Sequence, residues 1–360
     1  MLDSTYYLKN NKKKLIVFFS SYTTKKGKFD FWKIGQDLSQ EADILFLADY
    51  SKSWYLKEIE KIESFLKNII LSYASTNIYF IGGSMGAYGA LLFGTKLNVN
   101  IVSFGSDMIL KAPFSQSSRR LTINVPNKYK HVLSFFKDYT AKAFIYTGEL
   151  DHSDLCYTNL IPNTEDIIVK IIKNCFHSIP IYLNSLQILE SFILEIIQKN
   201  KSPNYPFITT YSKLNLNHKT IKKILEAKND LNTLLELDKS YLSYFYVGFN
   251  LYKDKNYKKA IKLKSLNMNK NNIQTLLFLG MSLREMNQCT QALIIFKSIE
   301  NNSFVEYSRM NFEIALLYKK MGDDINAIYY LYKSISEDYN TEKSLLLLKL
   351  LSNNLLKGQE

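Results

Sequence analysis

Cysteine is scarce in this chain of 360 residues, which contains only Cys156, Cys175 and Cys289. Three cysteines are too few, and odd in number, for the disulfide framework that holds small secreted domains together. No Cys-x-x-Cys pair occurs, so a structural zinc site of the usual spacing is also excluded. The sequence therefore predicts a protein that keeps its thiols reduced.

Long hydrophobic runs are missing as well. The apolar run at residues 15–19 is far shorter than the apolar region of a secretory signal peptide. No stretch approaches the roughly 18 uninterrupted apolar residues that a membrane helix needs. We therefore expect a soluble, cytoplasmic protein without a membrane span.

Acidic residues are outnumbered by basic ones, 33 against 46, which gives a net charge of +13. Residues 1–200 hold 23 basic and 18 acidic residues (+5), and residues 201–360 hold 23 and 15 (+8). A nucleic-acid module would concentrate this excess, so nucleic-acid binding is not expected and compositional bias is the simpler explanation. Residues 251–300 carry nine basic and three acidic residues. This patch leaves open an anionic polymer or an acidic protein as partner.

The length of the chain favours two domains, because single hydrophobic cores stop growing at roughly 250–300 residues. A composition that is 46% hydrophobic and 22% charged excludes a disordered chain. Up to about residue 200, short apolar strands alternate with helical patterns, and beyond about residue 205 only helices are indicated. We predict an α/β domain at 1–200, a linker at 200–205 and an all-α domain at 201–360.

The first half has the pattern of a mostly parallel sheet covered by helices on both faces. Strands are expected at residues 15–19, 43–48, 78–81, 101–104, 143–146 and 167–172, and helices at 53–73, from 85 to about 96, at 129–137 and at 179–198. In such sheets, ligand sites lie at the carboxyl ends of the strands.

In the second half, small residues recur at regular steps. They stand at positions 248, 280 and 315, and again at 260, 292 and 327, with steps of 32 and 35 residues in both series. This pattern resembles tetratricopeptide repeats, whose unit is about 34 residues. Such arrays bind partners on a concave surface. An ordinary helical bundle is the alternative.

The sequence Gly82-Gly83-Ser84-Met85-Gly86 follows a predicted strand and precedes a predicted helix. This Gly-x-Ser-x-Gly pattern is typical of a nucleophile elbow, a sharp turn that lifts the serine hydroxyl above the sheet edge. The amide of Met85, at the positive end of the helix, would then face the oxygen of a bound acyl group. The alternative is a glycine-rich turn without chemistry.

A serine nucleophile needs a base, and the chain has four histidines. His218 lies near the linker, His131 lies between two prolines, and His152 directly follows Asp151. His177 comes just after the last predicted strand of the first half. It therefore lies on the same rim as Ser84, the sheet edge formed by the carboxyl ends of the strands. His177 is therefore the predicted base.

The acid that orients the base should follow the preceding strand on the same rim. Asp151 is the favoured residue, Asp154 is its competitor and Glu149 is a weaker third. The cluster at residues 151–154 could also be interpreted as metal ligands. Adjacent side chains on a short turn seldom point at one ion, so no metal site is predicted.

The chain order Ser84, Asp151, His177 resembles that of the α/β-hydrolase superfamily over roughly residues 12–200. Within it, the chain is similar to a bacterial group found with surface-polysaccharide biosynthesis. The stretches that match are ADYSKSWY at 48–55, GSMGAYGALLFG at 83–94, FGS at 104–106 and CFH at 175–177. The resemblance implies that these three residues form a catalytic triad. At 106–107 this chain has Ser-Asp where the group is expected to have a proline and a polar amide.

Three further assignments complete the predicted site. The second oxyanion donor is expected in the loop after the first strand, at the amide of Ser21 or Tyr22. Trp54 and Tyr55 follow the second strand on the same rim, where aromatic rings stack on sugars or pack against the next helix.

The predicted chemistry is acyl transfer through an acyl-enzyme on Ser84. The resemblance favours an O-acetyltransferase that acts on a surface (capsular) polysaccharide, with acetyl-CoA as acyl donor and no bound cofactor. A carboxylesterase or deacetylase is the first alternative. A non-catalytic helical-repeat adaptor fused to a decayed hydrolase domain is the second. Lipase action finds little support, since no apolar lid segment is evident.

Overall fold

The computed structural model describes twelve ranges of the chain, which carry all statements about its structure. They are residues 5–112, 115–149, 151–161, 163–173, 175, 177–210, 247–248, 251–252, 254–266, 273–300, 307–336 and 341–357. The chain forms two compact units, residues 1–229 and 230–360.

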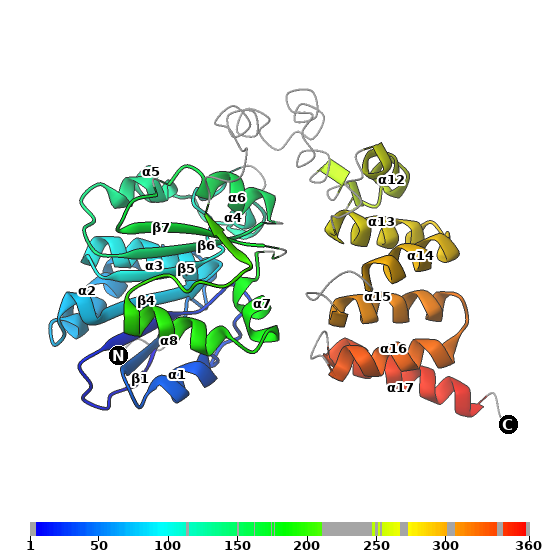
Figure 1. Ribbon diagram of the computed structural model, residues 1–360, viewed down its shortest axis with the longest axis horizontal. Coiled ribbons are helices and arrows are strands. Elements are labelled where there is room, and N and C mark those ends of the chain that lie inside the picture. Colours follow the sequence, from blue (N-terminus) through cyan, green and yellow to red (C-terminus); the bar gives the residue numbers. More distant parts are fainter. Residues whose placement is uncertain are drawn as a thin grey trace. The chain divides into compact units, whose positions relative to one another are not determined.

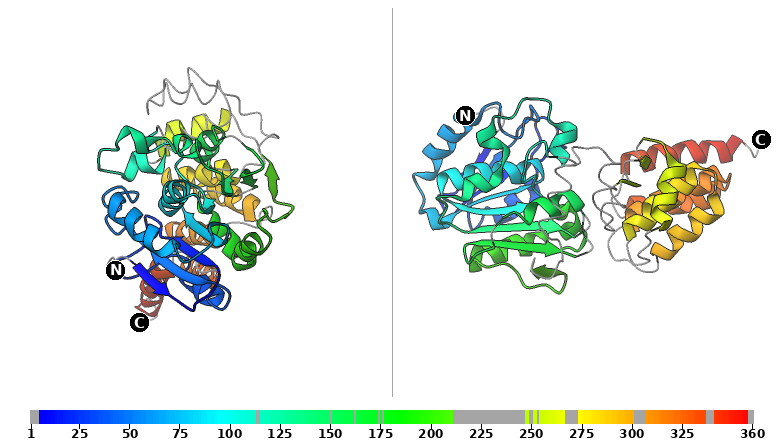
Figure 2. Two further views of the ribbon diagram at one scale, coloured as in Figure 1. Left: turned by 90° about the vertical axis from the view of Figure 1, so that its left-hand side faces the viewer. Right: turned by 90° about the horizontal axis from the view of Figure 1, so that it is seen from above.

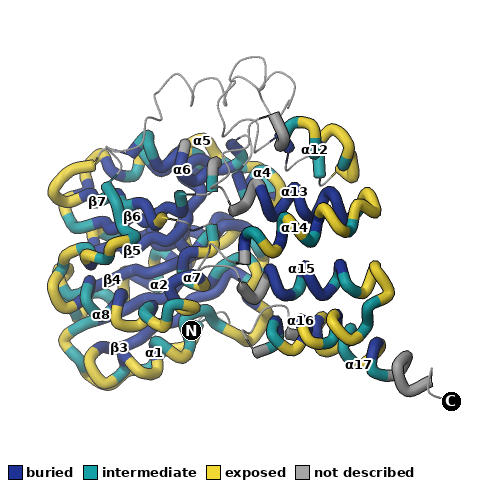
Figure 3. The backbone as a smooth tube through the Cα atoms, turned by 45° about the vertical axis from the view of Figure 1, so that its right-hand side comes forward, coloured by how far each residue is buried: buried dark blue, intermediate teal, exposed yellow. Residues whose placement is uncertain are grey.

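The first unit is built on an eight-stranded sheet with the order β1-β3-β2-β4-β5-β6-β7-β8 (Figure 1). Its strands are β1 (Thr5–Leu8), β2 (Leu15–Phe19), β3 (Asp43–Leu47), β4 (Ile78–Gly83), β5 (Asn100–Phe104), β6 (Ala143–Gly148), β7 (Ile167–Ile172) and β8 (Ile208–Thr210). The strands from β3 to β7 run parallel, and β1 and β8 close the two edges antiparallel. Strands β2, β4, β5 and β6 are buried over their whole length, and Figure 3 shows β4, β5 and β6 as buried. In β2 an unbroken apolar run predicts this burial.

Helices cover both faces of this sheet (Figure 2). They are α1 (Trp32–Leu38), α2 (Ile59–Ile70), α3 (Met85–Leu97), α4 (Gln116–Arg120), α5 (Asn127–Lys130), α6 (His152–Thr158), α7 (Ile179–Ser185) and α8 (Leu189–Lys199), with short 3-10 turns η1 (Ser75–Asn77) and η2 (Val132–Phe136). Helix α8 packs its Phe192 against Phe104 and Tyr146 on one face. Helix α3 lies on the other face, where Gly94 meets Ile101.

The predicted parallel sheet and its flanking helices are confirmed, but the strands at both edges were not predicted. Strand β1 is short and partly exposed, which leaves it without a buried apolar run. Strand β8 lies just after the predicted linker, in the segment that was assigned to the helical domain at 201–360. It extends the sheet because Ile208–Thr210 pairs with β7, while Tyr205 stacks on Phe192.

Two predicted helices begin or end elsewhere. The long helix expected at 179–198 is broken into α7 and α8, with Gln187 in the left-handed region (φ 57°) between them. The helix expected from residue 53 begins only at Ile59. The carboxylate of Asp49 accepts the amides of Ser51, Ser53 and Tyr55, and these bonds hold the preceding residues in a loop.

The second unit consists of helices in the residues that the structure describes. They are α12 (Tyr257–Leu266), α13 (Ile273–Glu285), α14 (Cys289–Glu300), α15 (Tyr307–Lys320), α16 (Asp324–Ser336) and α17 (Thr341–Lys357). Short turns at 286–288 and 321–323 join α13 to α14 and α15 to α16 as helix pairs (Figure 1).

The small residues of the predicted repeat lie at helix contacts. Ala260, Ala292, Ala315 and Ala327 are fully buried. A Cβ atom at Gly280 would lie 2.4 Å from the ring of Phe296 on α14, so only glycine lets these two helices approach so closely. The regular spacing therefore marks buried positions, and at Gly280 it marks a close contact between two helices.

No single helix of the described residues is both long enough and apolar enough to cross a membrane. The pair α7 and α8 passes the same test of length and composition when taken together, but it is bent by 109°.

The contact at Gly280 gives a test of the helical unit. Gly280→Val should push Phe296 out of place and destabilise this unit by about 1–3 kcal/mol. Thr290→Val, at an exposed position of α14, should change the stability by less than about 0.5 kcal/mol. The measurement is thermal unfolding of the full chain followed by circular dichroism. Equal unfolding temperatures for the two variants would contradict the close helix contact.

Candidate active site

Ser84 stands at the sharp turn between β4 and α3. Its backbone has φ 56° and ψ −121°, and its amide donates a hydrogen bond to the carbonyl of Phe104 on the neighbouring strand (2.9 Å). A Cβ atom at Gly82 would lie 2.2 Å from the carbonyl oxygen of Gly86, and one at Gly86 would lie 2.1 Å from that of Phe19. The two glycines are therefore required by close backbone approach, as the motif predicts.

His177 follows β7, and its ring links two other loops. Its Nε2 lies 2.6 Å from the hydroxyl oxygen of Ser84, and its Nδ1 lies 2.5 Å from Oδ2 of Asp154. A carboxylate only accepts hydrogen bonds, so Nδ1 carries the proton and Nε2 is left to accept from Ser84. The structure therefore brings together the predicted serine and the predicted histidine.

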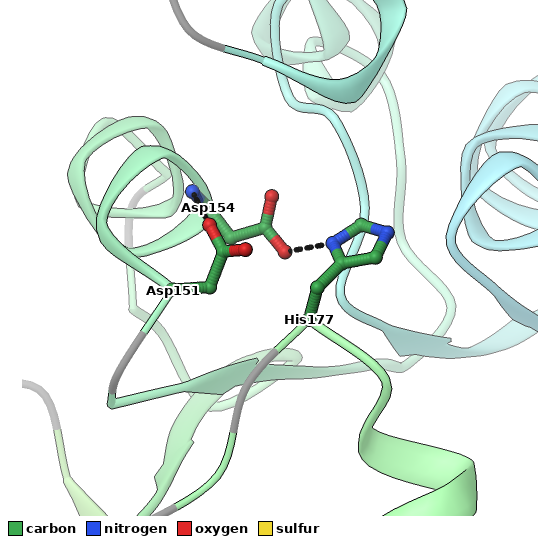
Figure 4. A group of neighbouring side chains, drawn as sticks. All are labelled: Asp151, Asp154 and His177. Atoms are coloured by element: carbon green, nitrogen blue, oxygen red, sulfur yellow. Dashed lines mark hydrogen bonds and ion pairs between the residues drawn. The ribbon is translucent and has the colours of Figure 1, made fainter. Parts of the chain in front are cut away.

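The carboxylate that meets His177 belongs to Asp154, the competitor in the sequence analysis, and not to the favoured Asp151 (Figure 4). Asp151 is the N-cap of α6, and its Oδ1 accepts hydrogen bonds from the amide of Asp154 and the hydroxyl of Ser153. Asp154 stands in the first turn of that helix, from which its side chain reaches His177. The assignment of Asp151 as the orienting acid is corrected to Asp154 on this geometry. Glu149, the third choice, is not a hydrogen-bond partner of the ring.

Glycine is also required at position 105, beside His177. Gly105 has φ 61°, and a Cβ atom there would lie 2.4 Å from the carbonyl oxygen of His177 and 3.3 Å from Oδ2 of Asp154. The loops after β5, β6 and β7 therefore meet at Gly105, where there is no room for a side chain.

The three acids around His177 favour its charged form. Burial alone would lower the pKa of His177, but the charge and hydrogen bond of Asp154 outweigh burial and raise that pKa, with Asp151 and Asp107 adding to the effect. Burial raises the pKa of Asp154. Its second oxygen, Oδ1, has no hydrogen-bond partner in the described part of the chain. The imidazolium that forms when His177 takes a proton is thus stabilised by charge.

Asp107 is the acid that sequence reasoning did not assign to the site. It is buried, and its carboxylate accepts the amides of Gln116 (3.1 Å) and Ser117 (2.7 Å) at the start of α4. Burial raises its pKa, and the positive charge of His177 lowers it. The only signal in the sequence was the departure from the expected motif at this position. Asp107 both anchors α4 and places a third carboxylate near His177.

One oxygen or nitrogen from each of Asp151, Asp154 and His177 lies within 4.8 Å of the others, as ligands of one metal ion would. The distance of 2.5 Å from Nδ1 to Oδ2 is a hydrogen-bond distance. Two ligands on a tetrahedral zinc ion would lie about 3.4 Å apart, given bonds of about 2.1 Å. This arrangement fits a hydrogen-bonded pair better than a pair of metal ligands.

Of the three predicted oxyanion donors, Met85 and Tyr22 remain candidates and Ser21 does not. Met85 is the first residue of α3, where a backbone N–H has no partner within the helix. The amide of Ser21 donates to Oδ2 of Asp30 (2.8 Å), so Ser21 is not available as the second donor. Tyr22 is the remaining choice of the two. Its loop lies against the start of α3, where Gly86 meets the carbonyls of Phe19 and Ser20.

Trp54 and Tyr55, assigned to sugar stacking, are 1% and 0% exposed. The hydroxyl of Tyr55 donates to the carbonyl of Ser20 (2.7 Å), and its ring packs edge-on against Phe19. The ring of Trp54 lies against Tyr22. Both assignments are therefore wrong, because the loop that Asp49 holds turns these rings into the core.

The other predicted positions lie away from the site or outside the description. His131 is exposed at the start of η2. His218 lies outside the described residues, and so does the side chain of His152.

The close approach at Gly105 predicts a position-specific effect. Gly105→Ala should displace the backbone of His177 and slow the labelling of Ser84 by a serine-directed fluorophosphonate about 100-fold, because small misplacements of a catalytic group cost this much. Gly27→Ala is the matched control, since Gly27 has a similar positive φ (78°) with nothing within 4 Å of its Cβ position. Equal rates for the two variants would mean that the His177 loop tolerates the clash.

The assignment of Asp154 predicts a pH effect. The base is active when Nε2 of His177 is free of a proton, and the carboxylates raise the pKa of His177. The labelling rate should therefore rise with pH, with a midpoint above the ordinary histidine value of about 6.5. Asp154→Asn should lower the labelling rate about 10³–10⁴-fold, because the ring loses its orienting acceptor.

Asp151→Asn is the matched variant for this experiment, because asparagine also caps helices. It should keep most of the labelling rate while the midpoint moves to lower pH, since one of the charges that favour the imidazolium is removed. A larger loss of rate in Asp151→Asn than in Asp154→Asn would restore Asp151 as the acid.

Comparison with known proteins gives matches to solved structures alone. No family model and no curated protein matches the chain. Solved structures similar to it include a capsule O-acetyltransferase of Neisseria meningitidis serogroup A, at 21% identity and a TM-score of 0.42 over 55% of this chain and 92% of that one. The esterase Est1E from Butyrivibrio proteoclasticus is similar at 16% identity and a TM-score of 0.36, over 54% and 94% of the two chains. A glycosylation-associated protein complex from Streptococcus agalactiae is similar at 14% identity and a TM-score of 0.39, over 55% of this chain and 45% of that one.

The topology of the first unit identifies its fold. Its central strands run parallel, and Ser84, Asp154 and His177 follow β4, β6 and β7 in that chain order. This is the order of the α/β-hydrolase fold. The chain is therefore an α/β-hydrolase-type unit followed by a helical unit.

Proposed function

We propose that this protein is a serine acyl-transfer enzyme, with Ser84 as nucleophile, His177 as general base and Asp154 as the acid that orients His177. The observation that carries the proposal is the continuous pair of hydrogen bonds from Ser84 to His177 (2.6 Å) and from His177 to Asp154 (2.5 Å). A base within hydrogen-bond reach of a serine, itself oriented by a carboxylate, is the arrangement that activates a hydroxyl.

The first half-reaction follows from these contacts. Nε2 of His177 takes the proton of the Ser84 hydroxyl while Oγ attacks the carbonyl carbon of an ester or thioester. The bond to the leaving oxygen or sulfur then breaks, and the leaving group takes the proton from His177. An ester on Ser84 remains, and Asp154 holds the ring and balances its positive charge throughout.

Backbone amides stabilise the negative oxygen of the tetrahedral intermediate. The amide of Met85 lies at the N-terminus of α3, a helix of 13 residues, where the helix dipole favours negative charge. The amide of Tyr22 is the second donor, since that of Ser21 is bound to Asp30.

The second half-reaction passes the acyl group to an acceptor, and we propose a carbohydrate hydroxyl of a surface polysaccharide with acetyl-CoA as donor. The sequence stretches at 48–55, 83–94, 104–106 and 175–177, similar to those of the polysaccharide-biosynthesis group, support this choice. The reaction would use acetyl-CoA in the cytoplasm. The helical unit would bind the polymer or a partner protein.

Hydrolysis is the second candidate, with water as acceptor, which makes the enzyme a carboxylesterase or deacetylase. The side chain of His177 is 14% exposed, so water can reach the base. The adaptor alternative is less well supported, because a hydrolase domain that had lost its activity would not be expected to retain both hydrogen bonds of the His177 ring.

A fluorophosphonate probe tests the nucleophile. Wild type should be labelled at Ser84, and Ser84→Ala should lose labelling, since the Ser84 hydroxyl is the one bonded to Nε2 of His177. Ser106→Ala is the matched control, because the Ser106 hydroxyl is buried on the same rim and has no hydrogen-bond partner among the described residues. Equal labelling of Ser84→Ala and wild type would refute the nucleophile.

A second experiment on the same protein distinguishes a carbohydrate hydroxyl from water as the acyl acceptor. Mass spectrometry after incubation with acetyl-CoA and candidate polysaccharides should show acetylated polymer with wild type and none with Ser84→Ala. Free acetate in place of acetylated polymer would identify a hydrolase.

A further inference from the structure

An open surface cavity of about 750 Å³ with a basic lining is formed by loops of the first unit. Four cationic side chains reach it: Lys25 and Lys26 from the loop after β2, Lys52 from the loop after β3, and Arg120 from the end of α4. The basic cavity is defined by these four side chains together with Tyr22 and Tyr50, which also line it.

The positive charge of the basic cavity is only partly balanced by the protein. Within the described ranges, none of its four cations forms an ion pair with a carboxylate. The carboxylates of Asp30 and Asp49 act on Lys52 through their charge, while their oxygens are hydrogen-bonded to other groups: Asp30 accepts the amide of Ser21 and the hydroxyl of Thr24, and Asp49 accepts five bonds from its own loop. Four cations against two carboxylates leave an excess of positive charge, which favours an anionic ligand.

The cavity lies at the edge of the sheet where Ser84 stands. Strand β4, which leads to Ser84, is flanked by β2 and β5. The loop after β2 supplies Tyr22, and the segment after β5 supplies Arg120, whose guanidinium lies 5.0 Å from the centre of the Tyr22 ring. The cavity is therefore bounded by the two loops on either side of the nucleophile.

Two of the four cationic side chains, Lys52 and Arg120, lie against the Tyr22 ring, whereas Lys25 and Lys26 are exposed. Nζ of Lys52 lies 5.5 Å from the centre of the same Tyr22 ring and donates to the carbonyl of Thr24. Burial lowers the pKa of Lys52, which is consistent with a partly dry environment. Arginine and lysine placed around aromatic rings are suited to phosphate groups attached to a flat ring system.

We propose that the basic cavity binds the phosphate groups of the acyl donor, a phosphate-bearing thioester of the acyl-coenzyme A type. The proposal rests on the proposed function, in which Ser84 takes an acyl group from a thioester. A ligand held here would extend its distal end along the same sheet edge toward Ser84, and Tyr22 would take part in both sites, through its ring and its amide.

The size of the cavity favours a donor over an anionic polymer. A volume of about 750 Å³ lies in the range of roughly 300–1,000 Å³ that small-molecule sites occupy. A polymer would need cationic side chains along an extended track, whereas these four converge on a single cavity.

Calorimetric titration of the full chain with coenzyme A tests the proposal without turnover. Coenzyme A should bind, the affinity should fall with added KCl, and pantetheine, which lacks the phosphates, should bind at least about 10-fold more weakly. Arg120→Gln and the double variant Lys25→Gln/Lys26→Gln should each weaken coenzyme A binding about 10-fold, and Arg120→Lys should restore part of the loss. Lys61→Gln, an exposed lysine on α2, is the control and should change nothing.

Three results would overturn the assignment: no binding of coenzyme A, equal affinity for pantetheine, or unchanged affinity in both charge variants. Binding of an anionic polysaccharide that depends on the same residues, without binding of coenzyme A, would assign the cavity to the acceptor instead. Fluorophosphonate labelling of the same wild-type sample separates the two proposals. A protein that is labelled but does not bind coenzyme A loses only the phosphate site, and one that binds but is not labelled loses only the serine chemistry.

Discussion

The two hydrogen bonds of the His177 ring are the interaction on which the rest of the site depends. They join residues that follow three different strands, β4, β6 and β7, and they exist only because parallel strands bring these loops to one edge of the sheet. The ring also needs a backbone that can approach closely, which Gly105 provides. A change in sheet order or at this glycine would separate the serine from its base.

The site is surrounded by buried acids that the fold tolerates for different reasons. Asp154 is held against a histidine that balances its charge, Asp107 is bound to the start of α4, and Asp49 is bound to five donors of its own loop. Burying a carboxylate is unfavourable unless its oxygens are bound. Of these three acids, Asp154 alone keeps a buried oxygen without a partner among the described residues, and this is the acid that contacts His177.

The sequence was sufficient to predict the parallel sheet, the elbow at Ser84 and the position of His177, because each has a strong local pattern. It did not distinguish Asp151 from Asp154, since both follow β6 and the outcome depends on the first turn of a short helix that no periodicity reveals. It also left open whether Trp54 and Tyr55 stack on a sugar or pack inside, because the bonds of Asp49 that turn them inward come from a polar residue outside any apolar pattern. The break between α7 and α8 was missed for a similar reason: Gln187 carries no glycine or proline signal, yet it adopts a left-handed conformation.

The two lysine-bearing loops of the basic cavity differ in how freely they can change. The loop of Lys52 is fixed, since Asp49 binds it and the adjoining Tyr55 is part of the core. The loop of Lys25 and Lys26 is exposed, and Gly27 within it has free space around its Cβ position. Residues 25–28 of this second loop are all exposed, so they can change in length or charge without disturbing the core. One side of the basic cavity is therefore fixed by the fold, and the other is open to change in sequence.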